Sequence, residues 1–190
     1  MKAIELSFGQ FFWRITACHM VTYMLLGILA FTIMDYPTQF AEPCSIMVPT
    51  DSPRVFLGPA LQAIRGLIFA AVLFPFREVI LESRHGWLKL WGLFLGLAIF
   101  STAGPAAGSV EGLIYTKIPA VDQIAGLWEV ILQTLLCSVL FVAWHHKPSR
   151  AWNVCMAMLV GLIVLMSISG AVFGQPEAPQ LSAHVSVSEK

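Results

Sequence analysis

The sequence predicts an all-α membrane protein, a polytopic bundle of about five spanning helices. Of its 190 residues, 57% are hydrophobic and only 12% are charged, and the mean hydropathy is +0.77. An average soluble domain has roughly 25% charged residues. So few charges cannot cover a water-facing surface, and the bilayer must therefore surround the chain. Helices are expected there because they satisfy their own backbone N–H and C=O groups.

Five apolar segments have the length of about 20 residues that a membrane-spanning helix needs. Residue types that begin helices mark their boundaries, since Ser52 and Pro53 precede the second segment and Pro119 precedes the fourth. No internal repeat is visible, so we expect one membrane domain over residues 1–174 and a polar tail over 175–190. The predicted spans are residues 15–34, 59–80, 87–103, 124–144 and 151–173.

The first span follows a short segment that carries Lys2 and Arg14, so a signal peptide is an alternative to a retained helix. The apolar stretch is longer than the usual core of a signal peptide, and no small-residue cleavage site follows it. We therefore expect a retained membrane helix. Aromatic and polar residues alternate just before it, which predicts a separate interfacial helix built on Phe8, Phe11, Phe12 and Trp13.

Lysine and arginine residues divide unevenly between the two sides of this predicted bundle. Because cytoplasmic loops carry an excess of these residues, we expect a cytoplasmic N-terminus and an extracytoplasmic C-terminus in a bacterial-type inner membrane. The cytoplasmic group is Lys2, Arg14, Arg77, Arg84, Lys89, Lys147 and Arg150. The opposite group is Arg54, Lys117 and Lys190.

Arg65 lies inside the second predicted span, where its guanidinium cannot lose its charge to escape lipid. Glu129 has a similar depth in the fourth span, because both helices are entered from the outer side. Gln62 shares a helix face with Arg65, and Gln133 shares one with Glu129. We therefore predict an Arg65–Glu129 pair that keeps the bundle interior neutral. Such a pair can also serve only to fix helix register, and Arg65 can instead extend toward the interface.

The connection over residues 101–123 is too apolar for an ordinary solvated loop. A helix that begins after Pro105 would present a flat face of small residues, so we predict a short interfacial or re-entrant helix. Gly92 and Gly96 form a second small-residue face, in the third span. Both faces are candidate docking surfaces for other membrane subunits, and the first of them consists of Gly104, Gly108 and Gly112.

Glu111 and Tyr115 would share one face of that short helix. If this face points into the bundle, the polar residues of three segments line one outward-facing pocket. The alternative is a tightly packed lid whose Glu111 faces water. The predicted ligand-binding residues of the pocket are Gln62, Arg65, Glu111, Tyr115, Glu129 and Gln133.

Several classes of function lose support. The net charge of zero differs from the basic surface of a nucleic-acid binder, and the four cysteines contain no Cys-x-x-Cys pair. His145 and His146 are neighbours that point in different directions, and His19 has no matching histidine across the bundle, so we expect neither a metal nor a haem or other cofactor. Phosphate-loop, dinucleotide-binding and common hydrolase motifs are absent from the sequence.

Three hypotheses for function follow from these patterns. The first is a protein that binds or transports a lipid headgroup or a small anionic solute through Arg65. The second is a non-catalytic accessory subunit of a larger membrane complex, docked through its glycine faces. The third is a membrane enzyme that uses Glu111 or Glu129 as a general acid or base on a lipid substrate, although a nearby Arg65 would oppose the required rise of the carboxyl pKa.

Overall fold

The computed structural model describes residues 6–41, 48, 50, 52–100 and 108–174, and these residues form helices without any strand. The prediction of an all-α fold is confirmed. The predicted polar tail, 175–190, lies outside the described residues. Two short segments have another helical geometry: a 3-10 turn at Phe74–Phe76 lies between α4 and α5, and a π turn at Gly96–Phe100 follows α6. The helices in chain order are α1 (Phe8–Ile33), α2 (Tyr36–Ala41), α3 (Pro53–Phe56), α4 (Gly58–Leu73), α5 (Arg77–Leu81), α6 (Gly86–Leu95), α7 (Val110–Tyr115), α8 (Ala120–His146) and α9 (Arg150–Phe173).

Three helices, α1, α8 and α9, are long and apolar enough to cross a membrane. The segment predicted as the second span is instead divided, because α4 ends at Leu73 and α5 begins only at Arg77. Pro75 lies in the turn between them, where its missing N–H removes a helical hydrogen bond. The segment predicted as the third span forms the shorter apolar helix Gly86–Phe100, and its expected last residues, 101–103, lie outside the described residues.

Helix α1 begins earlier than the sequence predicted. The Ser7 hydroxyl accepts a hydrogen bond from the Gln10 N–H at 3.4 Å, and the Gln10 side chain accepts one from the Ser7 N–H at 3.3 Å. This reciprocal capping box starts the helix at Phe8. The prediction of a separate interfacial helix is therefore wrong. Phe11 is fully buried and makes edge-on contacts with Phe74 and Phe141, and Phe12 and Trp13 pack against the same core, whereas Phe8 is 58% exposed.

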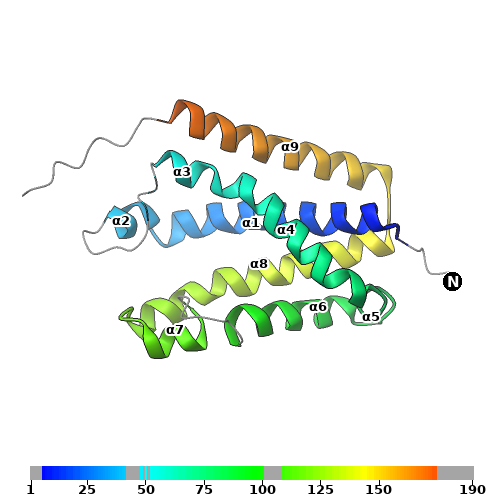
Figure 1. Cartoon of the computed structure of the whole chain (residues 1–190), viewed down its shortest axis with the longest axis horizontal. Coiled ribbons are helices and arrows are strands. Elements are labelled where there is room, and N and C mark those ends of the chain that lie inside the picture. The colour runs from blue at the N-terminus through cyan, green and yellow to red at the C-terminus, as the bar shows by residue number, and fades with distance from the viewer. Residues whose placement is uncertain (1–5, 42–47, 49, 51, 101–107, 175–190) are drawn as a thin grey trace, which may run out of the picture.

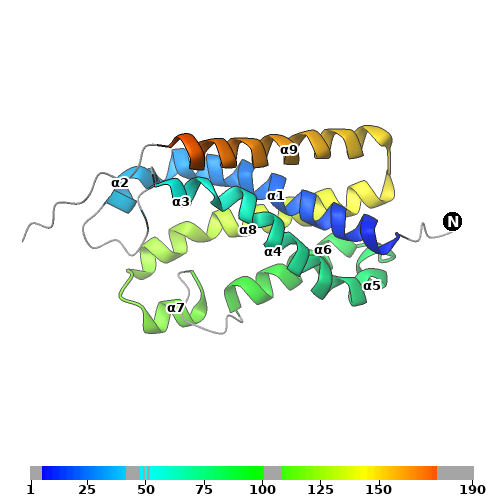
Figure 2. The ribbon, with the colours of Figure 1, turned by 45° about the horizontal axis from the view of Figure 1, so that its top comes forward.

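The helices pack in layers around α1 (Figure 1). Helix α1 lies between α9 on one side and α8 on the other, α4 crosses it, and α6 packs on α8 (Figure 2). A small residue permits the α1–α4 crossing, because a Cβ atom at Gly66 would come within 2.8 Å of the Thr16 Cα atom. Ala17 and Ala70 are fully buried beside this crossing. The two backbones therefore approach closely at one fixed point.

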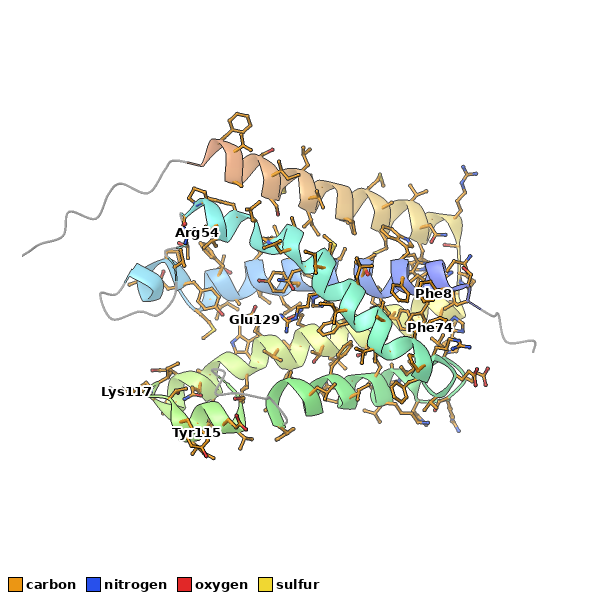
Figure 3. All side chains as sticks on the ribbon, in the orientation of Figure 1. Phe8, Arg54, Phe74, Tyr115, Lys117 and Glu129 are labelled. Carbon is orange, nitrogen blue, oxygen red and sulfur yellow. The ribbon has the colours of Figure 1, made fainter. Side chains whose placement is uncertain are left out.

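The two ends of the bundle differ in charge. The start of α1, α5 and the α8–α9 connection gather at one end, which we call the basic end (Figure 1). Arg54 and Lys117 lie at the other end, which we call the outer end, far from Phe8 and Phe74 (Figure 3). The cations predicted to share one side lie on the elements of the basic end or, for Arg84 and Lys89, between α5 and α6 and in the first turn of α6; Lys2 lies outside the described residues.

Arg14 is buried within the basic end. Its Nη1 atom donates a 3.5 Å hydrogen bond to the Trp144 carbonyl, and its guanidinium lies 5.3 Å from the centre of the Trp144 ring. Trp144 belongs to the last turn of α8, where carbonyl groups lack helical donors and the helix dipole is negative. Arg14 therefore caps the carboxyl end of α8 and joins it to the start of α1.

Candidate functional site

Arg65 lies on the flank of α4, with an exposed side chain. The helix places it roughly 10 Å along the axis from Gly58, the first residue of α4. Its guanidinium lies 5.5 Å from the centre of the Phe69 ring, one turn nearer the basic end. The side chain thus rests on an aromatic face of its own helix, which is a weakly stabilising cation–π contact.

Glu129 lies in α8, roughly 14 Å along the axis from Ala120, and its label in Figure 3 stands between α1 and α8. Its Oε2 atom accepts a hydrogen bond of 2.7 Å from the phenol of Tyr36, the first residue of α2. Burial, and then this hydrogen bond to a carboxylate, raise the pKa of Tyr36 above its ordinary value. Glu129 is therefore held by a tyrosine from the outer end of the bundle.

The predicted direct ion pair between Arg65 and Glu129 is not formed. Within the described residues, the ion pair present joins Arg77 to Glu78, which are adjacent and exposed. Tyr23 on α1 nevertheless lies within electrostatic range of both the Glu129 carboxylate and the Arg65 guanidinium. The two charges thus share one neighbourhood without direct contact. The phenol of Tyr36 occupies a carboxylate oxygen that a guanidinium would otherwise approach.

A part-buried hydrogen bond links α1 to α4 beside these charges. His19 Nε2 lies 3.1 Å from the Gln62 side-chain oxygen, and the His19 ring meets the Phe69 ring edge-on at 4.9 Å. His19 is only 5% exposed. His19 is thus an interior histidine with a hydrogen-bond partner, Gln62. Because the hydrogen bond requires an N–H on Nε2, Gln62 also selects that tautomer.

Three residues of the predicted pocket make none of these interactions. Tyr115 is 73% exposed on α7 and points away from the bundle at the outer end (Figure 3). Glu111 on the same helix and Gln133 on α8 are half-buried, and neither is hydrogen-bonded to Arg65 or Glu129 in the described part of the chain. A ligand-binding role for these three residues stays a prediction. The interacting residues, which we call the outer polar cluster, are His19, Tyr23, Tyr36, Gln62, Arg65, Phe69 and Glu129.

Gln123 determines where α7 lies. Its side chain, 4% exposed, accepts a 3.2 Å hydrogen bond from the Gly108 N–H and donates to the carbonyls of Ile118 at 2.8 Å and Gly112 at 3.4 Å. Gly108 has a φ of 80°, a conformation that glycine adopts without strain. The short helix predicted in this connection is thus the six-residue α7, folded against the start of α8. Gly104 of the predicted glycine face lies outside the described residues.

Comparison of the chain with protein-family models, with curated proteins and with solved structures finds no match. The outer polar cluster offers one permanent cation, one carboxylate, two phenols, an imidazole and an amide, which suits recognition of a polar group by charge and hydrogen bonding. Among the described residues, no group of three or more His, Cys, Asp or Glu side chains is placed to hold a metal ion.

Sequence reasoning missed Tyr23 and Tyr36, and it did not place His19 beside Gln62. A signal existed for two of them, since His19 and Tyr23 are four residues apart and share the face of α1 that meets α4. Tyr36 carried no periodic signal, because it follows the end of α1. Asp35, whose φ is 49°, turns the chain there.

Proposed function

We propose that this chain is a five-span protein of a bacterial-type inner membrane, whose outer polar cluster binds or transports an anionic group through Arg65. The group is a lipid headgroup or a small anionic solute. The observation that supports this proposal is an arginine in the middle of an apolar helix whose predicted acidic partner is engaged elsewhere. Intramembrane ionisable residues are by default candidates for functional sites.

The membrane topology is part of the proposal. Three helices are long enough to span, and we propose that the α3–α5 and α6 segments complete the two remaining crossings. The gathering of cations at the basic end supports a cytoplasmic position for that end, with the C-terminus on the opposite side. Helix α7 would then lie at the outer interface or enter it as a re-entrant helix.

In the part of the chain that the structure describes, no carboxylate pairs with Arg65, and this charge is the physical reason for an anion. A guanidinium stays protonated under all physiological conditions and presents five N–H donors in a rigid fork. In the described residues the contact of this fork is the Phe69 ring, which accepts no conventional hydrogen bond. In a bilayer, such a cation costs several kcal/mol unless water or an anion satisfies it. An oxyanion matches both its charge and its planar donor geometry.

Binding assays on the purified protein in phosphatidylcholine nanodiscs test this proposal with two probes, phosphatidylglycerol and inorganic phosphate. We expect Arg65→Gln to weaken binding of the recognised probe about 10- to 100-fold, the effect of losing hydrogen bonds to a charged group. Arg54→Gln is the matched control, because Arg54 is an exposed arginine at the outer end of the same segment. Its effect should stay below about twofold.

Folding of each variant is checked by circular dichroism and by elution volume in detergent. The proposal is wrong if the wild-type protein binds neither probe. It is also wrong if Arg65→Gln and Arg54→Gln weaken binding equally, because the site would then be no more than general surface charge.

A second candidate function, an accessory subunit, is favoured by one observation on α6. Cβ atoms added at Gly92 and at Gly96 would meet nothing within 4 Å, so no helix in the described part of the chain packs on this face. In membranes, such small-residue faces permit close approach of another helix. Sizing after extraction in mild detergent tests this function: a larger assembly that is lost in the Gly92→Leu, Gly96→Leu double variant supports it, whereas a lone chain contradicts it.

A further inference from the structure

Arg65 stands at the boundary between the outer polar cluster and an apolar face of α4. On one flank, Gln62 and Phe69 lead to the buried His19. On the other flank, large apolar side chains are about half exposed. These are Leu61 at 54%, Ile64 at 58%, Ile68 at 57% and Val72 at 54%. Their spacing of three and four residues makes them one continuous stripe along the helix beside Arg65.

The direction of this stripe relates it to the bilayer. Ile68 and Val72 follow Arg65 by one and two turns toward the basic end, whereas α4 begins at the outer end. The acyl chains of a lipid in the outer leaflet run from its headgroup toward the membrane centre. A lipid whose phosphate met Arg65 would therefore lay a chain along Ile68 and Val72.

The charges around Arg65 favour approach from the same flank. Glu129 is the acidic residue of the outer polar cluster, and it lies on the α1–α8 side, tied to Tyr36. An anion that entered between α4 and α8 would meet this carboxylate, and like charges repel. An anion that approaches over the apolar stripe meets the guanidinium alone. The stripe, however, is a surface that hydrocarbon and not water covers in a membrane.

We propose that the ligand of Arg65 is an anionic phospholipid of the outer leaflet, which enters sideways from the bilayer. This inference rests on the proposed anion site and names its ligand class. The lipid phosphate pairs with the Arg65 guanidinium, and one acyl chain packs on Ile68 and Val72. A free anion would have to leave water and cross hydrocarbon to reach the same flank, at a large cost in solvation free energy. A lipid carries its phosphate there with its tail already in hydrocarbon.

Native mass spectrometry of the full chain, titrated with phosphatidylglycerol or phosphatidylcholine, tests the lipid. We expect preference for phosphatidylglycerol, which Arg65→Gln reduces about 10- to 100-fold without changing phosphatidylcholine binding. Ile68→Ala should weaken phosphatidylglycerol binding about twofold, through the loss of a few van der Waals contacts with the acyl chain. Ile168→Ala is its matched control, because Ile168 is 50% exposed on a different helix, α9, and should leave the affinity unchanged.

If Arg65→Gln fails to fold, Arg65→Lys replaces it, and the retained charge without the planar fork should give an intermediate loss. Inorganic phosphate separates this inference from the proposed function. If phosphate binds in an Arg65-dependent manner while phosphatidylglycerol shows no preference, the anion site stands and the lipid assignment is overturned. If neither probe depends on Arg65, both are overturned. Equal losses in Ile68→Ala and Ile168→Ala would also overturn the acyl-chain position.

Discussion

The phenol of Tyr36 donates a 2.7 Å hydrogen bond to the carboxylate of Glu129, although 93 residues separate them in the chain. This bond ties the segment that follows α1 to the middle of α8, and it occupies the carboxylate that the sequence would pair with Arg65. The arrangement separates the two charges of the outer polar cluster. The Glu129 carboxylate is hydrogen-bonded to a neutral phenol, and in the described part of the chain the Arg65 guanidinium stays available to bind an anion.

Loss of this hydrogen bond should reduce stability. We expect Tyr36→Phe to lower the free energy of unfolding by about 1–3 kcal/mol, because it leaves the half-buried Glu129 carboxylate without its donor. Thermal unfolding in detergent, followed by circular dichroism, measures the change. Tyr115→Phe is the matched control, because the Tyr115 side chain is 73% exposed, and its effect should lie within about 0.5 kcal/mol.

The same bond predicts a dependence of stability on alkaline pH. The folded protein holds the pKa of Tyr36 above its ordinary value of 10.0, so the folded state keeps the phenolic proton to a higher pH than the unfolded state does. This contribution is fully present below about pH 10 and decreases as the pH rises above it, by at most about 1.4 kcal/mol per pH unit. The difference in unfolding free energy between wild type and Tyr36→Phe should therefore shrink above pH 10. A constant difference from pH 8 to pH 11 would contradict this assignment.

Arg14 should stabilise the bundle more than the exposed arginines of the same end. Arg14→Gln removes the cap on the Trp144 carbonyl and the contact with its indole ring. We expect a loss of about 1–3 kcal/mol in unfolding free energy. Arg150→Gln removes an exposed charge at the start of α9 and should change it by less than about 0.5 kcal/mol. Equal effects in chemical unfolding would show that the capping contact contributes nothing.

Gln123 should control the local stability of α7. Gln123→Ala leaves the part-buried Gly108 N–H and Ile118 carbonyl without their side-chain partner, at about 0.5–1.5 kcal/mol for each hydrogen bond. We expect faster amide hydrogen exchange over residues 108–118, with little change in the middle of α8. Gln133→Ala serves as the control for removal of a half-buried amide from the same helix. Unchanged exchange in Gln123→Ala would mean that α7 is held by other contacts.

Composition and apolar length were sufficient to predict the long helices. The predicted spans 124–144 and 151–173 correspond to α8 and α9, because an uninterrupted apolar run leaves no other regular structure. The division of the second predicted span was also visible in the sequence, as Pro75. A proline inside an apolar run interrupts a helix regardless of what surrounds it.

Contacts between distant segments were less predictable. The aromatic residues at the start of α1 give the same sequence pattern whether they face lipid headgroups or Phe74 and Phe141. Periodicity shows which residues share a helix face, but it does not show what that face packs against. The predicted direct pair between Arg65 and Glu129 was wrong for a related reason. Matched depth brought Arg65 and Glu129 into one region, but the donor that reached Glu129 came from Tyr36, in a turn without periodic pattern.

The contact of Gly66 with Thr16 limits how the outer polar cluster can move. A Cβ atom at this point would clash with Thr16, so a slide of α4 along α1 that brings a larger residue to the position of Gly66 is opposed. Arg65 directly precedes Gly66 on α4, so the same contact limits movement of the Arg65 backbone along α1. The guanidinium and the carboxylate of the cluster are thus held from two different helices, one through the backbone contact of Gly66 with Thr16 and the other through the hydrogen bond from Tyr36.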